Sequence, residues 1–294
     1  MKISVIVPQV NREEMFRWCL KGLQAQNFPK DEFEVIVVGS LPESLATDND
    51  CNFNVVPYSH RPGEKFPASH LRNLGAAAAR GELLIFLDCD IILPEYYLKF
   101  AWDKIGSTDA LMFSLRKKLP RTATYKELSD LKRIKCLKDE RADACNILGC
   151  EFSELKSICF WVYSHTLCIR REIFEKTGGF SEDFIGWGYE DLEFAYRLYR
   201  ADIPIICDNK SECYHIWHNE VIDDQRQQQV EENLQIFRDK HPDRMLDALS
   251  AYEMNFSAYM KIGLSFTAPE AYLLSMIEVF VRGYIAREEM ISES

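Results

Sequence analysis

The sequence predicts an α/β fold in which a mostly parallel central sheet is flanked by helices. Short apolar runs rich in β-branched residues alternate with segments whose apolar residues recur at helical spacing. The predicted strands comprise residues 3–7, 33–38, 52–56 and 82–87. Strands that alternate with helices usually pair in parallel, and ligands of such sheets bind beyond the carboxyl ends of the strands. Chemistry should therefore be sought at these strand ends.

Helices are predicted between these strands. The first begins at a capping arrangement of Asn11 and Glu14 and stops before Pro29, and the second lies between Pro67 and Gly81. Further along, the pattern predicts one or two strands in 158–169, helices at 171–176 and 189–200, and a strand at 203–207. Beyond residue 221 the chain reads as helical. We therefore expect a catalytic domain at 1–220 and a helical C-terminal extension at 221–294.

Composition limits the classes of partner and the cellular location. The net charge of -11 disfavours a nucleic acid partner. Ten cysteines without a secretory leader pattern indicate reduced thiols and a cytoplasmic protein, and no run of about 20 apolar residues predicts a membrane span. Lys and Arg gather in residues 116–141. A solvated helical face is the favoured interpretation of this stretch, and the alternative is an anionic acceptor or peripheral association with the inner face of the membrane.

The predicted strand at 82–87 ends in Asp88-Cys89-Asp90 and continues into further apolar residues. Two carboxylates in buried surroundings need a compensating cation, and Mg²⁺ or Mn²⁺ bound there would bridge to the phosphates of a nucleotide. The bland alternative is that these residues form a turn or a helix cap. Their position at a strand end favours the metal site.

A second group of acidic residues follows a glycine-rich segment, in which Trp187 and Gly188 precede Glu190 and Asp191. Acidic residues in a first helical turn also complement the helix dipole, which is the structural alternative. A Trp between glycines is more typical of a sugar site, where the ring provides a stacking surface. Adjacent helical positions point about 100° apart, so the two carboxylates should differ in role. We assign Asp191 as general base and Glu190 to acceptor binding.

Two histidines, His215 and His218, follow the predicted strand at 203–207. A neutral imidazole is a suitable third ligand for Mn²⁺ beside two carboxylates, although most such histidines are structural. Cys207 and Cys213 lie nearby, but their irregular spacing makes a structural zinc site the less favoured interpretation.

Taken together, these segments resemble glycosyltransferase family 2, whose catalytic domains have the GT-A fold. The resemblance rests on Ser4-Val5-Ile6-Val7-Pro8, Arg72-Asn73-Leu74-Gly75, Phe86-Leu87-Asp88-Cys89-Asp90 and the segment 178–197. That last segment looks like the Trp-Gly-x-Glu-Asp region shared by chondroitin-type polymerases, β-1,4-galactosyltransferases and polypeptide N-acetylgalactosaminyltransferases.

The resemblance implies a role for individual residues. Asp88 and Asp90 would hold metal and nucleotide-sugar, with His215 as a further ligand and His218 as the second candidate. The implied donor contacts are Pro8, Gln9, Val10, Ser40 and Arg72. Where the family usually has an Asp after the second strand, this chain has Gly39, so a usual nucleoside contact is missing.

The expected reaction is metal-dependent, inverting transfer of a hexose or N-acetylhexosamine from a UDP-sugar to a saccharide or glycoconjugate acceptor, in the synthesis of bacterial surface polysaccharide. UDP is implied by the resemblance alone. A retaining transferase and a non-catalytic nucleotide-sugar-binding subunit are the alternatives. The first predicted strand lacks a following glycine-rich phosphate loop, which disfavours a nucleotidyltransferase or a dinucleotide-dependent dehydrogenase.

Overall fold

The computed structural model describes residues 1–39, 53–59, 67–139, 141–142, 145–146, 149, 151–155, 158–218, 224–242 and 246. Its strands are β1 (Ile3–Gln9), β2 (Phe33–Gly39), β3 (Phe53–Pro57), β4 (Leu83–Leu87), β5 (Ile91–Ile92), β6 (Leu111–Lys118), β7 (Thr166–Arg170) and β8 (Ile205–His215). The helices are α1 (Glu13–Gln24), α3 (Ala68–Ala78), α4 (Tyr97–Ile105), α5 (Leu128–Leu131), α7 (Arg171–Lys176), α8 (Glu190–Arg200) and α9 (Asp224–Lys240). Two 3-10 turns, Phe152–Glu154 and Ile158–Trp161, precede β7.

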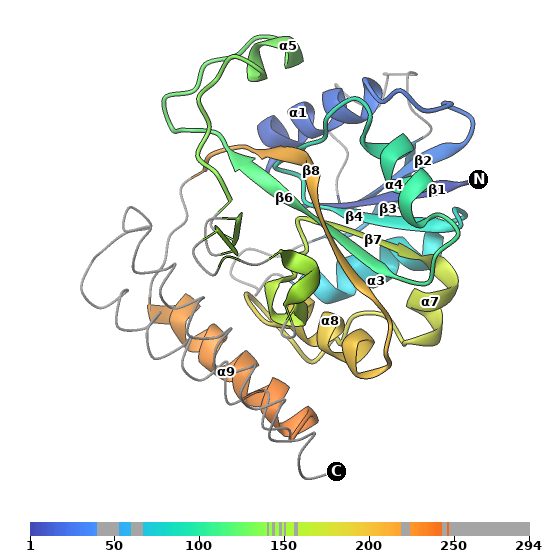
Figure 1. Ribbon diagram of the computed structural model, residues 1–294, viewed down its shortest axis with the longest axis vertical. Coiled ribbons are helices and arrows are strands. Elements are labelled where there is room, and N and C mark those ends of the chain that lie inside the picture. Colours follow the sequence, from blue (N-terminus) through green and yellow to red (C-terminus); the bar gives the residue numbers. More distant parts are fainter. Residues whose placement is uncertain are drawn as a thin grey trace.

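One sheet in the order β3-β2-β1-β4-β7-β6-β8-β5 forms the centre of the molecule (Figure 1). The half made of β3, β2, β1 and β4 is entirely parallel, as predicted. In the other half, β7 runs antiparallel to β4 and β6, and β8 pairs in parallel with β6. The α/β class is confirmed, with an antiparallel contribution that the sequence pattern did not predict.

Helices cover both faces of this sheet (Figure 1). On one face Val5 and Val35 pack with α1 and α4, and on the other Ile6 and Ile36 pack with α3, α7 and α8. Alternate strand residues therefore enter two separate apolar layers, which explains the largely apolar sequences of β1, β2 and β4.

Several local predictions were wrong. Asn11 does not cap α1, because it adopts a left-handed φ of 57° and Arg12 is the N-cap residue, without a side-chain bond. For the run at 158–169, by contrast, the prediction of one or two strands is confirmed with one strand, since its first residues form a buried 3-10 turn. β8 continues past 207 to His215 because Asp208 accepts hydrogen bonds from the backbone N–H groups of Lys210 and Ser211, which accommodates polar residues within the strand.

The basic stretch at 116–141 is not a solvated helical face. Its first three residues end β6, and in the part of it that the structure describes only the four residues of α5 and Arg141 are helical. Arg141 is fully buried, because the equally buried Asp139 binds it in a salt bridge of 2.7 Å. Arg141 is therefore not available to an anionic partner, while the membrane association of the other residues stays a prediction. Among the described residues, no helix has the length and apolar character needed to cross a bilayer.

Candidate active site

Asp88 and Asp90 follow the last residue of β4, in the turn that leads into β5. The turn is closed by the Ile91 N–H, which donates to Asp88 O at 3.1 Å. Asp90 is buried, with 4% of its surface exposed, whereas the Asp88 side chain is 38% exposed. The two carboxylates therefore occupy different surroundings, although they are separated by a single residue.

The pairing of β5 with β8 brings Asp90 to both histidines. Ile91 pairs with His215, and the Ile216 N–H donates to Asp90 O at 2.9 Å. As a result, one potential ligand atom from each of Asp90, His215 and His218 lies within 4.8 Å of the others. Asp88, predicted as a ligand too, is not part of this group of three.

The charges around Asp90 favour its ionised form. Burial opposes ionisation, but the hydrogen bond from His218 and the charge of Arg12 outweigh it and hold the pKa of Asp90 well below its usual value. Arg12 Nη1 donates to Asp90 Oδ2 at 2.5 Å. Burial, together with the charge of Arg116, lowers the pKa of His215 to about 3, so its imidazole is neutral.

One carboxylate and two imidazoles are a donor set that suits a divalent ion such as Mn²⁺. His215 meets the further requirement for a ligand, which is a neutral ring with a free lone pair at physiological pH. The residues present thus fit the predicted cation. By contrast, Cys213 is fully buried with its thiol directed at Leu115 O, 3.5 Å away, and it is not part of this group, so it gives no support to a zinc site.

Arg72 joins the acidic residues of the two distant segments. This guanidinium, on α3 and 4% exposed, donates to Asp88 Oδ1 at 3.2 Å and to Glu190 Oε1 at 3.0 Å. It also donates to Ser164 Oγ at 2.8 Å. The segment after β4 and the start of α8 therefore both contact the buried guanidinium of Arg72.

Asp191, the predicted base, lies in the first turn of α8. Its two carboxylate oxygens accept hydrogen bonds from the backbone N–H groups of Ser164, at 3.0 Å, and Leu192, at 2.9 Å. Burial and the nearby charge of Glu190 raise the pKa of Asp191 to about 7, against the opposing charge of Arg72. A carboxylate with this pKa can accept a proton near neutral pH.

The predicted acceptor residues Trp187 and Gly188 lie in the loop before α8. Trp187 is 40% exposed, and the guanidinium of Arg226 lies over its ring at 4.1 Å from the centroid. A residue of α9 therefore contacts one face of the ring that the sequence suggested as a sugar-stacking surface. Gly188 has a φ of 101°, which glycine adopts without strain.

The predicted nucleoside contacts lie at the carboxyl end of β1. Pro8 and Gln9 are buried and Val10 is half-buried, while Ser40 lies outside the described residues. Gly39 has a φ of 134°, and a Cβ there would lie 1.9 Å from Gln9 O. An Asp is therefore excluded at this position by the pairing of β1 with β2.

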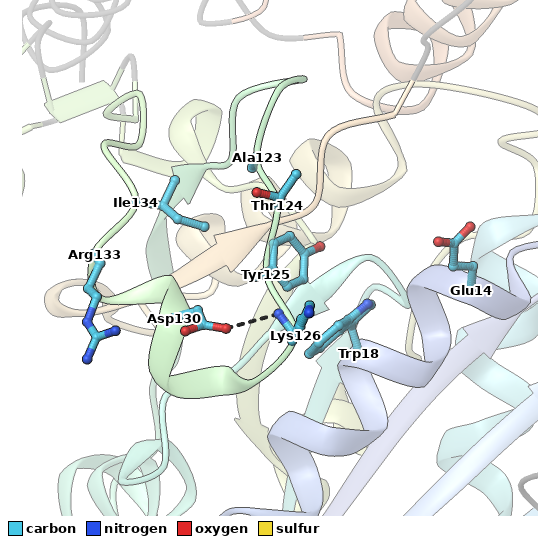
Figure 2. A pocket seen from close by; sticks show the side chains of 9 residues that line it. All are labelled: Glu14, Trp18, Ala123, Thr124, Tyr125, Lys126, Asp130, Arg133 and Ile134. Atoms are coloured by element: carbon cyan, nitrogen blue, oxygen red, sulfur yellow. Dashed lines mark hydrogen bonds between the residues drawn. The ribbon is translucent and has the colours of Figure 1, made fainter.

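A separate hollow of about 670 Å³ lies between α1 and the segment 123–134 (Figure 2). Trp18 and Tyr125 form an aromatic contact in its wall, at 4.6 Å between ring centroids. None of the predicted site residues lines it. The site assembled from Asp88, Asp90 and α8 is therefore a different place in the molecule.

Sequence reasoning missed two residues of this site. Arg12 was given no role from the sequence, and Ser164, which contacts both Arg72 and Asp191, belongs to no recognised motif. A polar residue two positions before a buried strand was the only available signal for Ser164.

A family model described as "Glycosyltransferase like family 2" matches residues 4–219, well over half of the chain. The chain belongs to this family. A relative of this family-2 protein is validoxylamine A glucosyltransferase of Streptomyces hygroscopicus subsp. limoneus, 24% identical over 230 residues, which cover 71% of this chain and 50% of that protein. This chain spans about half the length of the curated relatives it matches.

Two solved structures resemble this family-2 chain in fold. The crystal structure of Staphylococcus aureus TarS 1-349 in complex with UDP-GlcNAc has a TM-score of 0.57 at 18% identity, covering 91% of this chain and 74% of that one. Mannosyltransferase PcManGT from Pyrobaculum calidifontis, in complex with GDP-Man and Mn²⁺, has a TM-score of 0.55 at 17% identity, covering 100% and 76%. These likenesses confirm the predicted GT-A fold.

Proposed function

We propose that this chain is an inverting, metal-dependent glycosyltransferase that moves a hexose or N-acetylhexosamine from a UDP-sugar to a hydroxyl of a saccharide acceptor. The observation that carries the proposal is the position of Arg72. This side chain donates hydrogen bonds both to Asp88, in the turn after β4, and to Glu190, at the start of α8. A donor site and an acceptor site that share one guanidinium are close enough for group transfer between them. Family membership and the UDP-GlcNAc bound to TarS support the donor class.

On the donor side, Asp90, His215 and His218 would hold Mn²⁺ or Mg²⁺. When bound, the cation supplies Lewis-acid stabilisation of the negative charge on the departing diphosphate. Arg12, which now donates to Asp90, is available to contact a phosphate oxygen once a cation takes over the charge of that carboxylate. The Mn²⁺ that accompanies GDP-Man in PcManGT supports this choice of metal.

On the acceptor side, Asp191 accepts the proton of the attacking hydroxyl. Its pKa of about 7 matches this task, and the Ser164 and Leu192 N–H groups fix the orientation of its carboxylate. Glu190 is held by Arg72 and instead accepts a hydrogen bond from another acceptor hydroxyl. The hydroxyl oxygen then attacks the anomeric carbon from the face opposite the diphosphate, so the configuration inverts.

The proposed acceptor is a saccharide or glycoconjugate of a bacterial surface polymer. Support comes from relatives named as poly(ribitol-phosphate) beta-N-acetylglucosaminyltransferase and chondroitin synthase. The cytoplasm is the proposed location, because the eight cysteines among the described residues are free and nucleotide-sugar chemistry of this kind needs no disulfides.

Two measurements test the proposal. A thermal-shift screen of UDP, GDP, CDP and dTDP, each with and without Mn²⁺, should show stabilisation by UDP only when Mn²⁺ is present. NMR of the product formed from the matching α-linked donor sugar should show a β anomer. Stabilisation by none of the nucleotides would overturn the donor assignment, and an α product would replace the inverting mechanism with a retaining one.

A further inference from the structure

The loop that leads into Glu190 and Asp191 has an uncommon backbone conformation. Gly186 and Gly188 have φ values of 87° and 101°, and Tyr189, which is not a glycine, has a φ of 71°. A left-handed residue with a large side chain is unfavourable, and it persists only where the surroundings hold it in place. The position of the two carboxylates thus depends on whatever contacts this loop.

Helix α9 supplies hydrogen bonds to this loop. Asn233, 2% exposed, directs its side-chain amide at three carbonyl oxygens, those of Gly188 at 3.0 Å, Trp187 at 3.2 Å and Ile185 at 3.4 Å. In return, the Trp187 N–H donates to Gln229 Oε1 at 3.2 Å. Two side chains of one helix therefore bind four backbone groups of the loop.

Apolar contacts with α9 fix the same loop. Tyr189 is 4% exposed, and its ring packs against Phe237 of α9 at 6.3 Å between centroids. Helix and loop approach so closely that a Cβ at Gly186 would lie 2.3 Å from Gln229 Oε1. This close packing leaves the left-handed backbone little room to relax.

We propose that α9 acts as a clamp on the loop of residues 185–189, the acceptor loop. Its hydrogen bonds and packing hold this loop in the conformation that places Asp191 for catalysis, and Asn233 and Gln229 are the positioning residues. The inference rests on the proposed function for the role of Asp191. It also changes the expected domain organisation, because α9 begins at residue 224, beyond both the predicted boundary at 220 and the family match that ends at 219. The catalytic unit accordingly includes a helix from the predicted extension.

Variants that remove a single hydrogen-bonding group, compared with variants that keep it, distinguish this clamp from general packing. Asn233 acts as a donor, so Asn233→Asp, which is nearly isosteric, removes the donated bonds and sets a carboxylate against three carbonyl oxygens. Gln229 acts as an acceptor, so Gln229→Glu keeps its bond to the Trp187 N–H whereas Gln229→Leu removes it. Gln228→Glu is the matched control, because Gln228 is an exposed amide of the same helix that donates to Glu232, also on α9, at 2.8 Å.

Hydrogen exchange of a peptide covering residues 184–192 reads the loop directly in the full-length protein. We expect its amides to exchange about tenfold faster in Asn233→Asp and Gln229→Leu, and at the wild-type rate in Gln229→Glu and Gln228→Glu. Wild-type exchange in both Asn233→Asp and Gln229→Leu would overturn the clamp. This readout does not depend on catalysis, so it judges the clamp even if the protein turns over no UDP-sugar.

Hydrolysis of UDP-glucose and UDP-N-acetylglucosamine with Mn²⁺ then tests the link to catalysis, with water as the acceptor. We expect Asn233→Asp and Gln229→Leu to lower kcat about tenfold or more, with KM for the donor within twofold of wild type, because α9 contacts the acceptor loop and not Asp90. Wild-type kcat in a variant whose loop exchanges faster would contradict the positioning role. No turnover by the wild-type protein with any nucleotide-sugar would count instead against the proposed function.

Discussion

Ile91 of β5 pairs with His215 of β8, and together with the neighbouring pair of Ile92 and Tyr214 it brings the segment after β4 to the end of β8. The Ile216 N–H bond to Asp90 O extends the same ladder by one residue. Because backbone hydrogen bonds fix this register, the potential ligand atoms of Asp90 and His215 are held near each other, and that of His218 lies within 4.8 Å of both. Such preorganisation reduces the free energy spent on ordering ligands when a metal arrives.

Loss of one ligand should weaken metal binding. We expect His215→Ala and His218→Ala each to raise the Kd for Mn²⁺ about 10–100-fold, as measured by isothermal titration calorimetry in the presence of UDP. His70→Ala is the control, because His70 is exposed and pairs with Glu182 instead. Equal Mn²⁺ affinity in all three variants would mean that the cation binds elsewhere.

The rate of transfer should depend on the protonation state of Asp191. Because the base must be ionised and the pKa of Asp191 is raised to about 7, kcat/KM should increase with pH up to about 7 and then level off. Rates measured from pH 5 to 9 at fixed ionic strength check this. A profile that is already flat at pH 5 would point to a base with an ordinary carboxyl pKa.

The raised pKa of Asp191 should also make the free energy of unfolding depend on pH. The pKa of Asp191 is about 7 in the folded chain and close to 3.8 when unfolded, so the folded state binds more protons between these values. The stabilisation that the raised pKa of Asp191 gives the folded state is fully present below about pH 4, and it is lost as the pH rises through 7. Denaturant unfolding of Asp191→Asn should therefore show a smaller loss of stability over this range than the wild-type protein shows, and equal losses would contradict the shift.

Gly39 should not tolerate a side chain. A Cβ at this position would lie 1.9 Å from Gln9 O, so we expect Gly39→Ala to cost about 3 kcal/mol or more of unfolding free energy. Gly178→Ala is the control, since Gly178 also has a positive φ, of 82°, but its Cβ would meet no atom within 4 Å. That variant should cost about 1–2 kcal/mol. Similar costs for the two variants, from urea unfolding, would refute the steric explanation.

The parallel half of the sheet could be predicted because β1, β2 and β4 are buried on both faces and therefore have largely apolar sequences. The same argument placed Asp88 and Asp90 at a strand end. β8 escaped prediction beyond residue 207 because its polar residues satisfy local hydrogen bonds around Asp208, which hides the strand pattern. Arg141 was misjudged for a similar reason, as nothing in the sequence shows that Asp139 is buried with it.

The residues of the candidate site could be predicted from the sequence, but most of the contacts between them could not. Asp191, Glu190 and Arg72 were named from their motifs, but the bonds from Arg72 to both acidic segments depend on how α3 and α8 pack. The contact between Asn233 and Gly188 joins residues 45 positions apart and follows from the placement of α9 on the loop. Local sequence patterns carry no information about such a contact.

The central claim is that Asp191 removes the proton from the attacking hydroxyl. Its most direct test compares Asp191→Asn with Asp202→Asn, an exposed residue just past the other end of α8, at saturating UDP-sugar and Mn²⁺. We predict that Asp191→Asn lowers kcat for transfer and for donor hydrolysis about 10²–10⁴-fold, while its stabilisation by UDP with Mn²⁺ and the activity of Asp202→Asn match the wild-type protein. Wild-type kcat in Asp191→Asn would contradict the account.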